Sequence, residues 1–228
     1  MKTIEIKDFT HFLEEVRSHS TWTWSLFRGQ ADLEWSLKPK LARTAFGSRS
    51  ERELFDAWKR RAREFVPLLP ANDWEWLMLA QHHGLPTRLL DWTQNPLVAG
   101  FFACKDHPTK DAAIWMHRPQ KILSPKAIEK NPFEISEVCL LRPSSVSPRV
   151  ASQSGMFTVH GQRCWDLLDS TKSETIKYQI DSKLKTQFMD ELSFLGVNYA
   201  KVFPDLDGLA RQLTWVCERG DDLEREIT

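Results

Sequence analysis

Residues 81–96, QHHGLPTRLLDWTQNP, decide how the middle of this chain folds, because they contain two breaks between predicted elements. The apolar residues before this stretch predict a buried helix. Gly84 can adopt a positive φ at the end of that helix, and Pro86 prevents the helix from continuing. Asn95 and Pro96 are typical of a helix start, a capping side chain followed by proline at the first helical position. The stretch therefore predicts helix, turn, short strand and helix in succession.

Four polar side chains of this stretch are expected near the turn: His82, His83, Arg88 and Asp91. In a purely structural explanation, Asp91 caps the following helix, Arg88 pairs with an acid, and the histidines end the first helix, where their charge suits the helix dipole. In a functional explanation, the same side chains line a polar pocket. Their concentration between two apolar helices favours the pocket.

An arginine also lies at the end of a predicted strand, in Phe27-Arg28-Gly29. The guanidinium of Arg28 offers a rigid fork of donors that matches phosphate or carboxylate. Gly29 has no side chain, so a ligand or another backbone segment can approach closely. Alone, such a pair is typical of a strand end with a solvated charge, and it indicates a site only together with other motifs.

A third polar segment, residues 149–161, leads through Gly155 into a predicted strand over residues 156–160. Alternation places Phe157 and Val159 on one face of that strand and His160 on the other. If the two apolar side chains face the core, His160 faces a cleft or solvent.

The pattern of elements predicts an α+β fold: a single domain with a mixed or antiparallel sheet core flanked by helices. Strands and helices do not alternate regularly, and neither G-x-G-x-x-G nor a Walker loop is present, which disfavours a doubly wound nucleotide-binding fold. Strands are expected at 3–6, 23–28, 87–92, 112–117, 138–142 and 156–160. Helices are expected at 8–19, 52–66, 73–83, 96–104, 184–195 and 206–218.

The amino-acid composition excludes only a few broad classes of partner and site. The 228 residues include 31 Lys and Arg against 31 Asp and Glu, so no net field attracts nucleic acid or an anionic membrane. The four cysteines are widely spaced, without the pairing of a zinc site. No signal peptide or membrane-spanning apolar run is evident, so we expect a cytoplasmic protein without a membrane partner.

Taken together and in this order, the three segments resemble the FRG-domain family, named for the motif present here as Phe27-Arg28-Gly29. The second shared element is the signature of His82, Gly84, Thr87, Leu89, Leu90, Asp91, Trp92 and Thr93, and the third consists of Gln153, Gly155, Phe157, Thr158 and His160. The resemblance implies one FRG domain over residues 1–228, with a motif core at about 20–161 and a C-terminal helical part at about 175–220.

The order of these motifs is in turn similar to that of ADP-ribosyltransferases of the arginine type. This more distant resemblance implies an enzyme that uses NAD to modify a macromolecule, in a toxin or antiphage effector. It assigns catalytic roles to Arg28, Asp91, Gln153 and His82. It assigns NAD binding to Arg28, Gly29, Gln30, His83, Arg88, Trp92, Thr93, Phe157 and His160, and no metal is expected. Gln153 stands where such enzymes have a carboxylate, so Asp91 could supply the negative charge.

Two other classes of function stay open. A module that binds a nucleotide or a nucleic-acid end without chemistry would explain the neutral Gln153. A metal-dependent hydrolase could use His82, His83, Asp91 and His160, although adjacent histidines point in different directions on a helix. The acceptor of a transferase, protein or nucleic acid, is not specified by the sequence, and neither is an inhibitor or antitoxin partner that could hold it in check.

Overall fold

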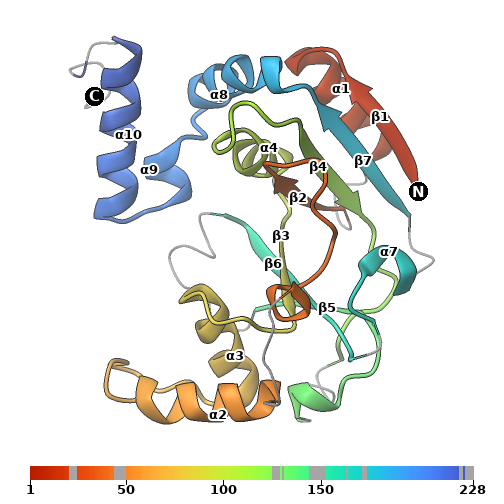
Figure 1. Cartoon of the computed structure of the whole chain (residues 1–228), viewed down its shortest axis with the longest axis vertical. Helices are drawn as coiled ribbons and strands as arrows, with labels where there is room; N and C mark the ends of the chain where they lie inside the picture. Colours follow the sequence, from red (N-terminus) through yellow and green to blue (C-terminus); the bar gives the residue numbers. More distant parts are fainter. Residues whose placement is uncertain are drawn as a thin grey trace.

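A computed structural model describes residues 1–20, 25–43, 50–124, 129, 131–143, 153–162, 164–170, 174–220 and 223. These residues form one sheet with helices packed against it (Figure 1). The strands are β1 (Lys2–Ile6), β2 (Leu26–Gln30), β3 (Leu89–Thr93), β4 (Ala112–His117), β5 (Cys139–Leu141), β6 (Gly155–Val159) and β7 (Thr175–Ile180). The α-helices are α1 (Phe9–His19), α2 (Glu51–Ala62), α3 (Asp73–His82), α4 (Pro96–Cys104), α7 (Leu167–Ser170), α8 (Lys185–Phe194), α9 (Tyr199–Val202) and α10 (Leu206–Arg219).

Within the described residues, the sheet has seven strands in the order β1-β7-β4-β2-β3-β6-β5. β1 pairs with β7 in parallel, and the other neighbouring pairs are antiparallel. The predicted α+β fold with a mixed sheet is therefore confirmed. β7 lies at the start of the part predicted to be helical, so the sequence analysis missed the strand that joins β1 to β4. Residues 23–24 of the predicted second strand lie outside the described residues.

The breaks around the central stretch form as predicted. The side chain of Asn95 accepts a hydrogen bond from the Leu97 N–H (2.9 Å), and Pro96 is the first residue of α4. Gly84 follows α3 with φ of 83°. α3 itself is capped by Asn72, whose side chain accepts from the Glu75 N–H (3.0 Å). These capping residues and the turn at Gly84 fix the direction in which α3, β3 and α4 follow one another.

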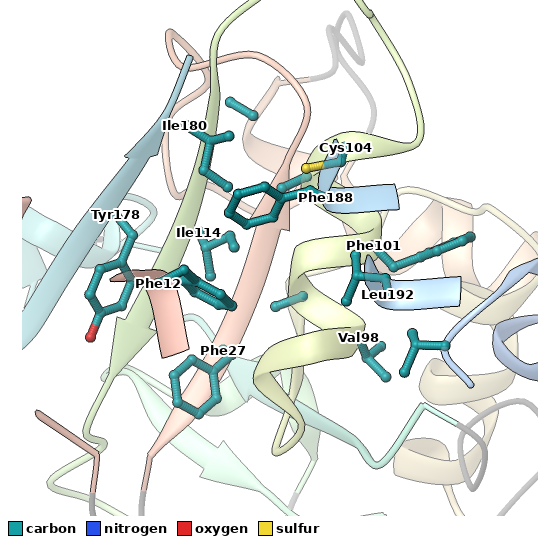
Figure 2. Packing of buried hydrophobic residues seen from close by; sticks show 14 of the residues in the cluster. Phe12, Phe27, Val98, Phe101, Cys104, Ile114, Tyr178, Ile180, Phe188 and Leu192 are labelled. Carbon is teal, nitrogen blue, oxygen red and sulfur yellow. The ribbon is translucent and has the colours of Figure 1, made fainter. Parts of the chain in front are cut away.

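The largest hydrophobic cluster lies where α1, α4 and α8 cover one face of β1, β7, β4 and β2. Figure 2 shows Leu192 of α8 beside Phe101 of α4, and the ring of Phe188 in α8 packs against Phe12 of α1, with centroids 5.7 Å apart. Burial of these side chains holds α4 against β2, and the N-terminal half of α4 forms one wall of the candidate site.

Two further clusters cover the half of the sheet formed by β3, β6 and β5. Leu89 and Phe157 pack against α2 and α3 through side chains that include Trp74. Leu90 alternates with Leu89 along β3 and belongs to the third cluster, together with Leu37. Both faces of β3 and β6 are therefore buried over most of their length, and a cavity is left where β3 meets β2.

Candidate functional site

A cavity of about 300 Å³ lies against β2, β3 and β6, between the last turn of α3 and the start of α4. It brings together many of the predicted site residues: Arg28, Gly29, His82, Asp91, Trp92, Thr93, Gln153 and Phe157. The rest of the lining is mostly apolar and includes Phe27, Met78, Val98, Phe102 and Met156. An apolar concavity with a few convergent polar groups is the usual form of a small-molecule site.

Arg28 reaches this cavity because β2 and β3 separate almost at once. Their ladder has one register pair in the described residues, Phe27 with Thr93. Beyond that pair, Arg28 Nη1 donates to the backbone carbonyl of Asp91 (2.7 Å) and lies 3.7 Å from the Asp91 carboxylate oxygen Oδ2. The buried Arg28 Nε has no hydrogen-bond partner among the described residues. Burial lowers the pKa of the guanidinium, and the Asp91 carboxylate opposes that effect. Arg28 lines the cavity with a side chain that is 18% exposed, so its guanidinium can donate to a ligand.

A short relay of hydrogen bonds orients the Asp91 carboxylate. The Thr87 hydroxyl donates to the side-chain oxygen of Gln81, which fixes the amide so that Gln81 Nε2 donates to Asp91 Oδ2 (2.9 Å). Asp91 itself is 56% exposed, so its second oxygen remains accessible. It does not cap α4, contrary to the structural explanation, because Asn95 does so. Gln81 was not among the predicted site residues, although a polar side chain at the end of an apolar helix was a usable signal.

Gln153 lies at the far side of the cavity and is held by two contacts. Its backbone carbonyl accepts from the Thr93 hydroxyl, and its Nε2 donates to the carbonyl of Val202 in α9 (3.1 Å). The side-chain oxygen of Gln153 is then left as an acceptor. Among the lining residues that the structure describes, Asp91 supplies the carboxylate and Gln153 a neutral acceptor.

A smaller basic pocket of about 170 Å³ adjoins the cavity and shares Arg28, Gln81 and Asp91 with it. Lys40 and Arg43, from the 3-10 helix Lys40–Arg43, also line this pocket. Lys40 Nζ donates to the carbonyl of Gly84 (2.7 Å), and the charge of Arg43 contributes to the lowered pKa of Arg28. Neither residue was predicted as part of the site, because single basic residues in a connecting segment show no periodic pattern. The site thus has an apolar part and a cationic part that meet at Arg28 and Asp91.

The two adjacent histidines line different pockets, as their successive positions at the end of a helix predict. His82 lines the cavity, whereas His83 lies on the opposite side of α3 with Leu79 and Leu85. The two rings meet edge to face, with their centroids 5.0 Å apart. His83 is thus placed away from the predicted NAD-binding group.

Gln30 and Arg88 also lie away from the cavity, in buried polar contacts. The side-chain oxygen of Gln30 accepts from Trp115 Nε1 (2.6 Å). Arg88 is fully buried and forms an ion pair with Glu51 of α2 (Nη2 to Oε2, 2.6 Å), and its Nη1 donates to the Pro132 carbonyl (3.2 Å). For Arg88, the structure shows the acid pairing that the structural explanation anticipated.

The expectation that His160 faces a cleft or solvent is wrong. Its ring is fully buried, because loops and α7 cover that face of the sheet. His160 Nδ1 lies 2.9 Å from the Cys164 carbonyl, which can only accept, so Nδ1 carries the proton. Nε2 then accepts from the Thr158 hydroxyl (3.0 Å), which itself accepts from Trp92 Nε1 (2.9 Å). Trp92 therefore contributes to the cavity wall while its polar atom points into the core.

The described residues contain neither a membrane-spanning helix nor a cluster of metal ligands. No helix there is both long enough and apolar enough to span a bilayer. No three His, Cys, Asp or Glu side chains in the described ranges are grouped so that they could hold a metal ion. The described residues therefore offer no set of ligands for the metal ion that a metal-dependent hydrolase would need.

No curated protein and no solved structure matched the chain. A family model did match, over a segment that contains β2, α2, α3, β3 and α4 and ends at the first residue of β4. Arg28, Gln81 and Asp91 lie in that segment, whereas Gln153 and His160 lie beyond it. Residues 23–112, which carry the Arg28–Asp91 contact of the candidate site, match the family model of the FRG domain.

Proposed function

We propose that the cavity and the adjoining basic pocket bind NAD, and that the protein is an ADP-ribosyltransferase-like enzyme that modifies a macromolecule. The observation that carries this proposal is the contact between Arg28 and Asp91 at the junction of the two pockets. It puts a donor fork and a carboxylate side by side, between an apolar space and a cationic one.

The shape of the two pockets supports this substrate. An apolar space of about 300 Å³ suits the nicotinamide ring and its ribose, and the cationic space of about 170 Å³ suits the pyrophosphate. Arg28 borders both spaces and would contact the ribose-phosphate link. The adenosine end of NAD would extend from the basic pocket towards solvent.

The chemistry requires negative charge near the ribose. When the bond between ribose C1′ and the nicotinamide nitrogen breaks, both electrons leave with nicotinamide, and the sugar becomes oxocarbenium-like. The Asp91 carboxylate, oriented by Gln81, would stabilise that positive charge. The side-chain oxygen of Gln153 would accept from a ribose hydroxyl. A lone pair of the acceptor then bonds to C1′, and the acceptor loses a proton to solvent.

A second function, binding of a nucleotide or nucleic-acid end without chemistry, is supported by the neutral amide of Gln153. The basic pocket formed with Lys40 and Arg43 would serve such a ligand equally well. For a transferase, the acceptor is a protein or a nucleic acid, and an inhibitor or antitoxin partner would restrain a toxin or antiphage effector of this kind.

The test compares wild type with Arg28→Ala, Asp91→Asn and, as a control, Arg17→Ala, which removes an exposed arginine of α1. Calorimetry measures NAD binding, and chromatography measures free nicotinamide. We expect Arg28→Ala to weaken binding by about 10- to 100-fold, because charge-assisted hydrogen bonds are lost. Asp91→Asn should retain binding and lower nicotinamide release by about 100-fold or more.

Labelled NAD in a bacterial lysate then separates the outcomes. Arg28-dependent label on a macromolecule supports the transferase and identifies its acceptor. Nicotinamide release without labelling would make the protein a glycohydrolase, and binding without release would favour the second function. The proposal fails if folded wild-type protein does not bind NAD or if Arg28→Ala binds it as tightly.

A further inference from the structure

An apolar groove of about 650 Å³ lies between α2 and α3, on the side of α3 away from the candidate site. Its lining is dominated by apolar and aromatic side chains: Leu54, Ala57, Trp58, Phe65, Val66 and Leu79. The groove shares no lining residue with the cavity, and the one residue that it shares with the basic pocket is Leu85.

Large apolar side chains stay exposed at the end of this groove. Phe65, which lines it, is 81% exposed, and Leu68, in the segment that follows, is 84% exposed. Leu69 adds a further exposed apolar side chain. Single exposed apolar residues are ordinary, but several of them beside an apolar groove mark a surface that binds a partner.

The rim of the groove carries uncompensated positive charge. Arg60 and Arg61 line it, and neither forms an ion pair or a side-chain hydrogen bond within the described residues. The acidic side chains of α2 have other partners: Glu51 pairs with Arg88, Glu53 with the Ser50 cap, and Asp56 with Arg52. Glu64 follows α2 and forms no ion pair with either arginine within the described residues. A ligand of this groove therefore meets an apolar floor beside two free guanidinium groups.

We propose that this groove binds an amphipathic helix of a partner protein, with an apolar face towards the groove and acidic residues along one flank. Two helices form the walls, a geometry in which a third helix packs its apolar stripe between them. The α2 wall, from Leu54 to Ala62, is about 12 Å long at the rise of an α-helix, and Phe65 and Val66 continue the lining beyond its end, enough for some two turns of ligand. Acidic residues on the ligand would neutralise Arg60 and Arg61.

The charge distribution disfavours two other occupants. A second copy of the chain, related by a two-fold axis, would bring Arg60 and Arg61 of both copies together at an apolar contact. A nucleic acid would pair with the arginines but would leave Leu54, Leu79 and Val66 without apolar contacts.

A displayed library of peptides of about 14 residues, patterned to form amphipathic helices with acidic, neutral or basic flanks, tests the proposal on the full chain. We expect wild type to enrich acidic peptides. For the enriched peptides, Phe65→Ala and Arg61→Glu should each weaken binding at least tenfold. Phe194→Ala, which removes an equally exposed phenylalanine from α8, and Arg17→Glu, on α1, are matched controls and should bind as wild type does.

Several results would overturn the proposal. The library could show no enrichment of acidic over basic flanks, or the enriched peptides could bind Phe65→Ala and Arg61→Glu as tightly as wild type. A dimer in light scattering that Phe65→Ala dissociates would assign the groove to a second copy. Loss of binding to a labelled oligonucleotide in Arg61→Glu, without any peptide binding, would assign it to nucleic acid.

Discussion

Gly29 determines how closely α4 approaches β2 and therefore where the wall of the candidate site lies. A Cβ atom at this position would overlap the Ala99 carbonyl oxygen and lie 2.5 Å from the Ala103 nitrogen. Both obstacles are backbone atoms of α4, so the helix as a whole would have to move.

We predict that Gly29→Ala lowers the free energy of unfolding by about 3 kcal/mol or more, because overpacking against backbone cannot be relieved by a side-chain rotation. Gly100→Ala is the matched control, since the nearest atom to its Cβ is a flexible Leu192 methyl at 3.6 Å. That change in α4 should be neutral or stabilise by up to about 1 kcal/mol. Urea denaturation measures both, and equal effects would contradict the close approach of α4.

The buried histidines make stability depend on pH. Burial lowers the pKa values of His117 and His160 from 6.5 to about 4, so both rings are neutral in the folded protein at pH 7. Between pH 6.5 and 4, the unfolded chain binds protons that the folded protein does not, and stability falls as the pH falls. The loss is on the order of 3 kcal/mol per histidine over this range.

The free energy of unfolding measured at pH 7 and at pH 5 tests this expectation. His117→Gln keeps a polar partner for Thr175, the residue that contacts the His117 ring, but cannot be protonated in this range. The variant should therefore lose less stability on acidification than wild type does. An identical pH dependence in both proteins would show that His117 is not held neutral by burial.

At this scale, sequence reasoning recognises residues with special chemistry but not their surroundings. Arg28 and Asp91 stood out because each lies in a motif, and both line the cavity. His160 was misplaced because alternation assigns side chains to faces of a strand without telling whether each face is covered. Here Leu37 and Leu167, from distant segments, help to cover the second face of the sheet.

One buried ion pair ties α2 to β3. Arg88 donates to Glu51 from Nε and Nη2, and Phe133 lies under the guanidinium, its centroid 5.2 Å from Cζ. The pair therefore holds Glu51, at the start of α2, beside Arg88, the residue that precedes β3.

We predict that Arg88→Met lowers the free energy of unfolding by about 3 to 5 kcal/mol, because Glu51 is left as a buried charge without its partner. The double variant Glu51→Leu/Arg88→Met should recover a large part of that loss, since two apolar side chains can pack where the ion pair was. Thermal denaturation of both single variants and the double variant gives the coupling energy. Additive losses would mean that the two residues do not act as a pair.

Elements with local signals could be predicted, and the others could not. Asp8, Asn95 and Asp205 each precede a helix and cap it in the structure. The alternation of Ile176, Tyr178 and Ile180 with polar residues was an equally clear strand signal, but it lies in a stretch predicted to belong to a helical part.

At the scale of the whole molecule, the order of the strands in the sheet determines whether a fragment of the chain can fold by itself. The segment that matches the FRG domain, residues 23–112, contains β2 and β3, which share a single register pair. β2 forms its long ladder with β4, and β3 forms its long ladder with β6. Both partner strands follow the segment in the sequence, except that Ala112, the first residue of β4, is its last residue.

We predict that a fragment of residues 23–112 does not fold, because an isolated pair of strands with one ladder pair cannot form a stable sheet. Its proton–nitrogen NMR spectrum should show the narrow amide dispersion of an unfolded chain, and its circular dichroism should change without a cooperative transition on heating. A cooperative transition would mean that α2, α3 and α4 form a core of their own.

The sheet order is also what the sequence could not predict. Fold class follows from the mixture of helical and strand patterns, but the neighbours of a strand depend on contacts between distant residues. Lys40 and Arg43 show the same limit for the site, because only the fold brings them beside Arg28.

The parallel pairing of β1 with β7 has a consequence for biosynthesis. Lys2 pairs with Ile176, so β1 leaves the ribosome long before its partner is made. At 5–20 residues per second, the delay is roughly 9 to 35 s. During that time the backbone edge of β1 has no partner strand, and it is open to pairing with another molecule.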